Sequence, residues 1–541
     1  MSQPEAPFDF DVIQIGYGPV SKASALFLSR LGWSVGVFER FGEVYPLPRA
    51  VCIDHELYRV LCAAGLGDIA RRVCCDAPVY RWYNAEWQEL LAIDWAAGSI
   101  SGGSEVTFIH QPSFEHALDE RVKAQRNIAV HLNSDAVAIR QAEDHVIVTI
   151  RDTQTGATRD YTARYVIGID GANSFVRESL GIRRVDLGFE ADWLVIDFAL
   201  NDGLTARDLG IPDCGQYANP LRPTTIVPGG TQADGRLLRR WEFMRLPHET
   251  REEMIREEKV WELLSDWIKP DQGELIRHAL YTFRSLVAET FQAGRIFLAG
   301  DAAHVMPPFM GQGMCAGLRD VWNLAWKLDR VLSGSASPAL LDTYTPERAP
   351  HVTDVIKISM FLGSIICMPD PQDARRRDDM FFSGNAPQIA PFPILTDGLL
   401  ERDGAGAALA PAGQLSCAGT VRYRGTTAHY DVFVPAGTFT LVTLAGFELS
   451  TRVRELCAKC GITIVTVVDR RTAGDEQIAD TQGQFSRFMD ARGIRAMLVR
   501  PDFYIFGGAG DALRLEAMLG EFLRQAAAFD VGLPEAQKLS A

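Results

Sequence analysis

The stretch Asp11-Val-Ile-Gln-Ile-Gly-Tyr-Gly-Pro-Val-Ser21 decides the fold of the first part of the chain. Its apolar beginning predicts a short buried strand that leads directly into a glycine-rich turn. Residues 22–31 then have helical character, and residues 34–38 form a second predicted strand. Strand, glycine turn, helix and strand in this order are typical of the βαβ unit that binds dinucleotides.

The glycines of this turn and the acid that ends the unit predict its chemistry. Gly16 permits the tight turn, and Gly18 lets the backbone approach a pyrophosphate at the N-terminal end of the helix. Glu39 is placed to accept hydrogen bonds from a ribose hydroxyl. Ser21 stands where this pattern usually has a third glycine. We therefore predict dinucleotide binding with a departure at Ser21.

A second glycine-rich motif indicates which dinucleotide is bound. Gly300-Asp-Ala-Ala-His304 follows a buried run, and a Pro-Pro pair and Gly311-Gln-Gly313 lead into a long predicted helix. A carboxylate at the end of a strand can hold a ribitol or ribose hydroxyl. A glycine loop that opens a helix can present N–H groups to the electron-rich end of a flavin. This arrangement indicates FAD.

A third turn, Asp170-Gly-Ala-Asn-Ser174, follows another predicted strand. Taken alone, each of these turns could also be a structural connection between a strand and a helix. His304 titrates near neutral pH and so invites a role as a base. Within its turn, we expect it to be structural instead.

Composition excludes several classes of protein. The chain has 541 residues, 47% hydrophobic and 23% charged, which is ordinary for a globular protein of about three domains. Its 54 Lys and Arg against 69 Asp and Glu give a net charge of −15, which argues against nucleic acid or an anionic membrane as main partner. Ten cysteines are too sparse for a disulfide scaffold. We expect a cytoplasmic protein without a signal peptide, a membrane span or a metal site.

The order of elements predicts an α/β protein whose first domain is discontinuous. A Rossmann-like FAD-binding domain is expected from residues 1–181 and 285–368, with a small insert near 80–105. The strand-rich residues 182–284 between its two parts are expected to form an inserted mixed β-sheet domain for the substrate. The remaining two segments are expected to be a linker at 369–420 and a separate α/β domain at 421–541.

Together, the three motifs resemble those of the FAD-dependent aromatic hydroxylases, the class A flavoprotein monooxygenases, over residues 8–365. Three segments look most like the 3-(3-hydroxyphenyl)propionate 2-hydroxylase branch: Pro48-Arg-Ala-Val-Cys-Ile-Asp54, Phe243-Met-Arg-Leu-Pro-His-Glu-Thr250 and Gly311-Gln-Gly-Met-Cys-Ala-Gly317. Related phenol and polyketide hydroxylases share most of these features. The C-terminal domain resembles the inactive thioredoxin-like appendage of the same group.

The resemblance implies a set of cofactor contacts. The first glycine turn and Glu39 would hold the ADP half of FAD, Asp301 the ribityl-pyrophosphate region, and Pro308 through Cys315 the isoalloxazine. The turn at Asp170 would serve both FAD and NAD(P)H, because the family lacks a separate nicotinamide domain. The expected cofactor residues are Gly16, Gly18, Pro19, Val20, Glu39, Arg40, Arg49, Ala50, Gln111, Val137, Asp170, Gly171, Gly300, Asp301, Pro308, Gly311, Gly313, Met314 and Cys315. Cys315 is a second departure, because many members have asparagine there.

The resemblance also implies a mechanism that relies on the flavin rather than on a catalytic side chain. NADH or NADPH would reduce FAD, O2 would add at the flavin C4a position as a hydroperoxide, and the distal oxygen would transfer to an activated phenol. The backbone at Pro308 and Gly311 is expected near the oxygen site. The expected substrate is a small phenolic acid, hydroxylated ortho to its hydroxyl.

The substrate is expected between the FAD-binding domain and the inserted sheet. Period-two alternation places Trp241, Phe243 and Arg245 on one strand face and Tyr281 and Phe283 on another. Because the protein is acidic, a phenolic carboxylate would need a local cation, for which Arg245 is the candidate. Aromatic stripes of this kind are more often ordinary core. The substrate candidates are Trp193, Tyr217, Trp241, Phe243, Arg245 and Tyr281.

Other functions remain as alternatives. Within the same class, the substrate could be a bulkier polycyclic phenol. A flavin-dependent halogenase would carry a W-x-W-x-I-P segment, which this sequence lacks. A non-catalytic flavoprotein, or a homodimer built through the appended domain, is supported only by that domain. Cys457-Ala-Lys-Cys460 lies at the end of a predicted helix and not after a strand, so we expect no disulfide chemistry there.

Overall fold

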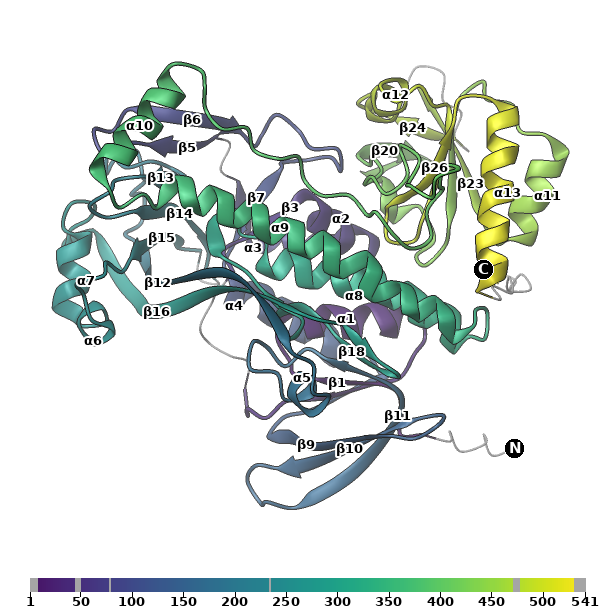
Figure 1. The fold of residues 1–541 in the computed structure, drawn as a ribbon, viewed down its shortest axis with the longest axis horizontal. Coiled ribbons are helices and arrows are strands. Elements are labelled where there is room, and N and C mark those ends of the chain that lie inside the picture. The colour runs from purple at the N-terminus through teal and green to yellow at the C-terminus, as the bar shows by residue number, and fades with distance from the viewer. Residues whose placement is uncertain (1–7, 44–49, 77–78, 233–234, 470–476, 530–541) are drawn as a thin grey trace.

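The computed structural model of the chain describes residues 8–43, 50–76, 79–232, 235–469 and 477–529. Among these residues, two eight-stranded sheets and a three-stranded sheet occupy the first part of the chain, and a seven-stranded sheet forms the C-terminal part. Figure 1 shows the C-terminal sheet and its helices, in light green and yellow, as a body of its own beside the long helices α8 and α9.

The first eight-stranded sheet carries the predicted βαβ unit. β1 (Phe10–Ile15), α1 (Pro19–Arg30) and β2 (Val35–Phe38) follow one another, and β1 pairs in parallel with β2. The strand order β17-β18-β11-β1-β2-β8 joins strands from both ends of this region of the chain, and β10 pairs with β11 and β9. The other elements here are β8 (Ile128–His131), β9 (Ser134–Gln141), β10 (Val146–Asp152), β11 (Thr158–Gly168), α5 (Phe175–Ser179), β17 (Gln292–Ala293) and β18 (Ile296–Leu298).

The second eight-stranded sheet has the order β19-β16-β12-β15-β14-β13-β5-β6. Its longest strands, β12 (Arg184–Leu200) and β16 (Gly273–Ala288), pair antiparallel. The hairpin of β5 (Val79–Tyr83) and β6 (Glu89–Asp94) joins this sheet through parallel pairing of β5 with β13. The expected insert near 80–105 therefore extends the second sheet and not the first. The remaining strands are β13 (Gly215–Tyr217), β14 (Thr224–Thr231), β15 (Leu237–Met244) and β19 (His304–Val305).

Alternation along the strands gives the second sheet two different faces. Trp193 on β12 pairs with Met244 and Tyr281 and packs edge-to-face on Phe309, with ring centroids 5.7 Å apart. We call this side the inner face. Leu194, the next residue along β12, lies on the opposite, outer face, in an apolar cluster with residues of α6 (Arg251–Met254) and α7 (Glu257–Leu264).

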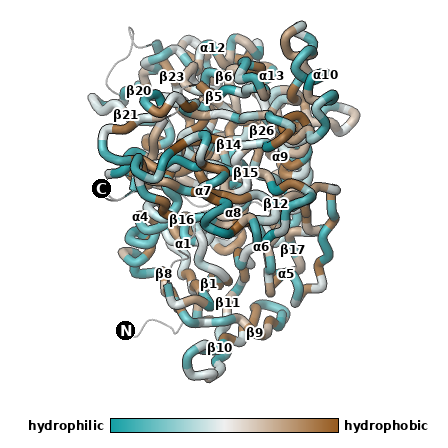
Figure 2. Tube along the Cα trace, turned by 90° about the vertical axis from the view of Figure 1, so that its left-hand side faces the viewer, coloured by the Kyte–Doolittle hydropathy of each residue, from teal (hydrophilic) through white to brown (hydrophobic). Residues whose placement is uncertain are grey.

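Two long helices connect the sheets. α8 (Gly313–Leu332) packs against α1, and α9 (Tyr344–Ile366) packs against the short helix η3 (Pro308–Met310). Figure 2 shows hydrophobic residues, in brown, along α9 and its neighbouring strands. By length and composition alone, Pro338–Ile366 could cross a membrane, but 56% of its most apolar 18-residue window is buried, as in a core helix.

Several smaller elements complete the first part of the chain. They are β3 (Cys52–Asp54), α2 (His55–Ala63), α3 (Gly67–Val73), β4 (Cys74–Asp76), β7 (Val106–Ile109), α4 (Gln111–Lys123), η1 (Pro270–Gln272), η2 (Gly300–Ala302) and η4 (Pro338–Thr343). The expected linker contains a helix, α10 (Pro371–Phe382), whose N-terminal amides donate to the Asp370 side chain. Its charged sequence hid it from the search for apolar periodicity.

The C-terminal sheet has the order β21-β20-β24-β23-β22-β25-β26. Its elements are β20 (Thr420–Tyr423), β21 (Thr426–His429), η5 (Tyr430–Val432), β22 (Thr440–Leu444), α11 (Thr451–Lys459), β23 (Thr463–Asp469), β24 (Ile478–Asp480), α12 (Gln484–Asp490), β25 (Ala496–Val499), β26 (Ile505–Ala509) and α13 (Ala512–Ala528). β22 and β23 pair in parallel around α11, whereas β25 and β26 run antiparallel.

Two buried ion pairs fasten the C-terminal part to the rest of the protein. Arg59 Nε on α2 lies 2.8 Å from Asp431 Oδ2, and Arg500 Nη2 lies 2.6 Å from Glu347 Oε2 on α9. All four side chains are at most 4% exposed. Glu347 also binds Lys327 Nζ on α8 at 2.8 Å, so the second contact is a network and not an isolated pair.

Candidate active site

The first glycine turn is built so that a phosphate can approach it. Gly16 has a φ of +101°, and a Cβ there would lie 2.3 Å from the carbonyl oxygen of Ile169, so only glycine fits. Gly18 precedes α1 without a side-chain cap, and a Cβ on it would meet nothing within 4 Å. The backbone at Gly18 is therefore open to an approaching group, and beyond Pro19, which has no N–H, the amides from Val20 onward begin α1 without a side-chain partner.

Glu39 is held in position at the end of β2. Its Oε2 accepts from the Tyr17 amide at 2.9 Å, and its Oε1 accepts from the Phe41 amide at 3.0 Å. These bonds orient the carboxylate while leaving each oxygen further lone pairs for ribose hydroxyls. Arg40 is exposed and lies over the Phe41 ring at 4.9 Å. Val137 is half-buried at the irregularity where β9 pairs with β10.

The departure at Ser21 is compensated inside the βαβ unit. Ser21 is fully buried, and its hydroxyl lies 2.9 Å from the side-chain amide of Gln14 on β1. The same amide group binds the Ser24 hydroxyl at 2.7 Å. Close packing of a helix on a strand, usually achieved with glycine, is achieved here with a buried polar cluster.

Gln14→Leu is expected to destabilise the protein by about 1–3 kcal/mol, because it leaves two buried hydroxyls without partners. Urea unfolding of the apoprotein measures the loss. The matched control adds Ser21→Ala and Ser24→Ala to the same variant, which removes the unpaired hydroxyls and should restore much of the stability. Equal stability of the single and triple variants would contradict this account.

A buried network that sequence reasoning missed supports the first glycine turn. Lys22 Nζ donates to the Tyr17 carbonyl at 2.5 Å and to Glu115 at 2.8 Å. Glu115 also accepts from Gln111, whose Oε1 accepts from the Ala50 amide at 2.6 Å. The predicted cofactor residues Gln111 and Ala50 are therefore linked to the glycine turn. Arg49 lies outside the described residues.

The turn at Asp170 lies directly against the first glycine turn. A Cβ on Gly16 would come within 2.9 Å of the Asp170 Cα, so the two backbones touch. Asp170 accepts from Ser174 Oγ at 2.5 Å and from the Val176 amide at 3.0 Å, and burial raises the pKa of its carboxyl. Gly171 adopts a left-handed φ of +81°. Asp170 thus caps α5 at the edge of the site.

The second glycine loop opens α8. Gly311 has a φ of +63°, and a Cβ on it would collide with Cys52 Sγ. The loop leads to Gly313, the first residue of α8, and this helix start has no side-chain cap, so its amides are open to an electron-rich group. Cys315 is fully buried, with its Sγ 4.0 Å from the carbonyls of Cys52 and Gly311. Its side chain therefore faces the protein interior. Pro308 and Met314 belong to the same loop and helix start.

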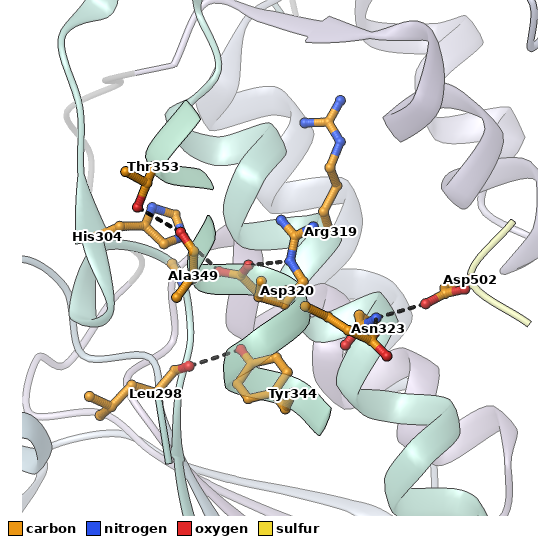
Figure 3. A network of polar contacts seen from close by, with 12 residues as sticks. Leu298, His304, Arg319, Asp320, Asn323, Tyr344, Ala349, Thr353 and Asp502 are labelled. Carbon is orange, nitrogen blue, oxygen red and sulfur yellow. Dashed lines mark hydrogen bonds and ion pairs between the residues drawn. The ribbon is translucent and has the colours of Figure 1, made fainter. Parts of the chain in front are cut away.

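Asp320 on α8 fixes the preceding Gly-Asp loop (Figure 3). Its Oδ2 accepts from the Gly300 amide at 3.1 Å and contacts His304 Nε2 at 2.7 Å, while its Oδ1 accepts from Arg348 Nε at 2.9 Å. Burial alone would raise the pKa of Asp320, but the neighbouring charges of His304 and Arg348 lower it. His304 is at most 1% exposed and bound to Asp320, as expected for a structural residue. Asp301, which lies between Gly300 and His304 in this loop, is half-buried.

The substrate candidates divide between the two faces of the second sheet. Trp193 and Tyr281 lie on the inner face, beside Phe309 of the flavin loop. Trp241 and Phe243 share a face, as alternation predicted, but they lie on the outer face in the cluster covered by α6 and α7. Both positions are therefore wrong for a substrate wall.

Tyr217 and Arg245 also require correction. The Tyr217 hydroxyl donates to the Ala85 carbonyl at 3.0 Å, and its ring stacks on Trp87 and lies with the outer-face cluster. Arg245 Nε binds Asp192 at 2.9 Å, and its Nη1 donates to the Glu249 carbonyl at 2.7 Å. Arg245 is therefore a structural residue of the outer side and not a ligand for a substrate carboxylate.

The inner face carries charges that sequence reasoning missed. Asp197, Arg240 and Arg277 occupy adjacent positions on β12, β15 and β16, and Glu242 lies two residues after Arg240. Alternation within Arg240-Trp-Glu-Phe243 places Arg240 and Glu242 on one side of the strand and Trp241 and Phe243 on the other. This alternation was the sequence signal for buried charges, because a strand inside the protein must bury at least one of its two faces.

Comparisons with known proteins place the chain among flavin-dependent hydroxylases. A family model described as an FAD binding domain matches residues 9–359, and one described as the HcaD C-terminal domain matches residues 420–525. A probable NADH-specific resorcinol 4-hydroxylase of Rhodococcus jostii is 34% identical over 95% of this chain and 94% of its own. A 3-(3-hydroxy-phenyl)propionate/3-hydroxycinnamic acid hydroxylase of Escherichia coli is 29% identical over 93% of this chain and 92% of its own.

Solved structures share the fold. The flavin-dependent monooxygenase PieE, in complex with FAD and substrate, superposes with a TM-score of 0.77 at 21% identity, over 96% of this chain and 99% of that one. Aklavinone-11 hydroxylase, with FAD and aklavinone, gives 0.75 at 23% identity, over 96% and 100%. Both uncapped helix starts and the glycine-lined approach fit FAD. The chain therefore belongs to the family of FAD-dependent monooxygenases that hydroxylate aromatic compounds.

Proposed function

We propose that this enzyme hydroxylates a small phenol ortho to its hydroxyl, with NADH or NADPH as reductant. The observation that carries the proposal is the inner face of the second sheet, where buried aromatic residues lie against the loop Pro308–Gly311 that opens α8. When bound, FAD would carry electrons from the nicotinamide to O2 and supply the electrophilic oxygen atom.

The residues of this chain would bind FAD, orient the substrate and shield the reacting ring from water. The glycine turn with Gly16 and Gly18 and the carboxylate of Glu39 would hold the ADP half, and Asp301 and the start of α8 the flavin half. The other cofactor residues predicted at these two loops stay assigned to FAD. Trp193 and Phe309 form an apolar wall that would exclude water from the reacting ring.

A phenolic acid of the 3-(3-hydroxyphenyl)propionate type is the first substrate candidate, supported by the named relatives. A neutral phenol of the resorcinol type is the second, favoured by one observation. Among the described residues, Arg240 and Arg277 on the inner face already bind Asp197, and Arg245 lies on the other side of the sheet. A polycyclic phenol or a non-catalytic flavoprotein is left as an outcome of the test.

We further propose the domain division and the nature of the tail. The FAD-binding domain would comprise residues 1–181 and 285–368, with the substrate sheet between them, and a thioredoxin-like domain would follow residue 420. The order β22-α11-β23 followed by the antiparallel β25-β26 and α13 supports this fold. Cys457 and Cys460 end α11, away from the start of that helix, so the tail would be redox-inert. A cytoplasmic location and a homodimer complete the proposal.

The purified holoenzyme is expected to be yellow and to oxidise NADH or NADPH much faster when its phenol is added. We would compare 3-(3-hydroxyphenyl)propionate, resorcinol and aklavinone by stopped-flow flavin reduction, and follow incorporation of one 18O atom from 18O2 into the product. Labelled product from either small phenol supports the proposal. Flavin reduction without any labelled product from the three compounds would reject it.

A further inference from the structure

The inner face of the second sheet carries a row of charged side chains, separated from its aromatic wall by one intervening row of residues. Arg240 Nε and Nη2 bind the two carboxylate oxygens of Asp197 at 2.7 and 3.1 Å, and Arg277 Nε binds Asp197 Oδ2 at 2.6 Å. These three side chains are at most 9% exposed. One carboxylate thus binds two guanidiniums.

Glu242 lies in the next row, between the charged row and the aromatic wall. Its neighbours across the sheet are Val195 on β12 and Thr225 on β14. Its side chain is 10% exposed, and its nearest cation is Arg240, with Nη1 to Oε1 at 3.9 Å. Within the described part of the chain, the Glu242 carboxylate accepts no hydrogen bond. Because this carboxylate is mostly buried but its oxygens are not fully enclosed, it can accept a hydrogen bond from a ligand that enters the site.

The electrostatic surroundings of Glu242 agree with such a role. Burial raises the pKa of its carboxyl, and nearby Asp197 raises it further, while Arg240 and Arg277 oppose the shift. The carboxyl is therefore a better proton acceptor than an ordinary surface glutamate. Tyr281, the other polar group of the wall, is already engaged, because its hydroxyl accepts from Arg277 Nη1 at 2.9 Å.

Glu242 also lies toward the flavin loop. Burial and the charges of Asp54 and Glu242 raise the pKa of the Cys52 thiol to about 12, which places Glu242 within electrostatic reach of that thiol. Cys52 Sγ lies 3.8 Å from the Gly311 carbonyl oxygen. On the other side, Trp193 of the adjacent row contacts Phe309. Glu242 therefore lies on the face of the sheet that contacts the loop Pro308–Gly311 through Trp193.

We propose that Glu242 accepts the phenolic hydroxyl of the substrate and takes up its proton, with the Arg240–Asp197 pair positioned behind it. This inference rests on the proposed function. The O–H bond of the phenol breaks, the proton binds a Glu242 oxygen, and the electron pair stays on the phenolate oxygen. The guanidiniums of Arg240 and Arg277 near Glu242 favour that phenolate, and the electron-rich ring then reacts more readily with an electrophilic oxygen. The site thus selects compounds with a free ring hydroxyl.

The test measures discrimination between a phenol and its methyl ether. The probes are 3-(3-hydroxyphenyl)propionate with its O-methyl ether, and resorcinol with 1,3-dimethoxybenzene, titrated into the oxidised holoenzyme by flavin absorbance without turnover. The wild type is expected to bind one hydroxylated probe about 10-fold or more tightly than its ether, because a buried acceptor rejects a ligand that cannot donate.

Glu242→Leu is expected to reduce that ratio to near one, and the isosteric Glu242→Gln, which keeps an acceptor but not the charge, to reduce it in part. Glu190→Gln is the matched control, because Glu190 lies on β12 of the same sheet but is exposed and paired with Arg284. FAD content and thermal unfolding establish that each variant is folded. A wild-type ratio retained in both Glu242 variants overturns the inference alone. Failure of both hydroxylated probes to bind the wild type rejects the proposed substrates and this inference with them.

Discussion

Gly18→Ala is expected to give a folded protein that no longer retains FAD. A Cβ at Gly18 would meet no protein atom within 4 Å, so the chain itself tolerates the methyl group. The methyl group would instead occupy the space through which the backbone approaches a pyrophosphate. We expect FAD affinity to fall about 100-fold, because losing charge-assisted hydrogen bonds to a phosphate costs about 3 kcal/mol. Titration of the apoprotein with FAD, followed by flavin fluorescence, measures the change.

Gly16→Ala provides the contrast. Its Cβ would lie 2.3 Å from the Ile169 carbonyl oxygen, at a φ of +101° that alanine rarely adopts, so the apoprotein itself should be destabilised. Circular dichroism of the two apoproteins during urea unfolding separates these effects. Retention of FAD by the Gly18 variant, or equal apoprotein stability of the two variants, would show that the turn does not work as described.

Arg500→Met is expected to destabilise the protein by about 3–5 kcal/mol, because it removes a buried cation shared by two buried carboxylates. Arg500 binds Glu347 at 2.6 Å and Asp502 at 2.7 Å, and all three side chains are at most 2% exposed. Asp502 also accepts from Asn323 at 2.7 Å (Figure 3), so the loss would spread into α8. Thermal and urea unfolding of the holoenzyme measure the effect.

The same variant should change the response to acid. Burial alone would raise the pKa of Glu347, but the charges of Arg500 and Lys327 lower it. A carboxyl whose pKa is lowered by folding contributes stability above its ordinary pKa and loses that contribution as the pH falls below it. Without Arg500 the pKa rises, so acid unfolding should begin at a higher pH. Arg495→Met, which removes an exposed arginine 4.0 Å from Asp490, is the control and should alter stability by at most about 1 kcal/mol.

Local features of the fold were predictable from the sequence, whereas the elements that cover each face of a strand were not. The βαβ unit and its glycine turn follow from residues adjacent in the chain, and the structure has them as expected. Alternation correctly grouped Trp241 with Phe243 and Tyr281 with Phe283. It carries no information about what covers each face. That assignment depended on α6 and α7, which pack over the first group.

Buried charge was the other feature that sequence reasoning missed. Asp197, Arg240 and Glu242 would be interpreted as solvent-exposed in most strands, since charged residues are rarely fully buried unless paired. Their pairing joins separate strands, so no local pattern reveals it. Ser21 is similar, because its partner Gln14 is a polar residue in the middle of an otherwise apolar strand. An isolated polar residue in a core strand was the signal that could have located that cluster.

The hairpin β5–β6 has a consequence for biosynthesis. Trp82 on β5 pairs in parallel with Gln216, 134 residues further along the chain. During translation the hairpin therefore leaves the ribosome long before its partner strand exists, with one edge unpaired and open to association with other chains. Parallel pairing over such a separation is slow to form. Newly made chains should thus depend on chaperones until β13 has been synthesised, and expression at lower temperature should raise the yield of folded enzyme.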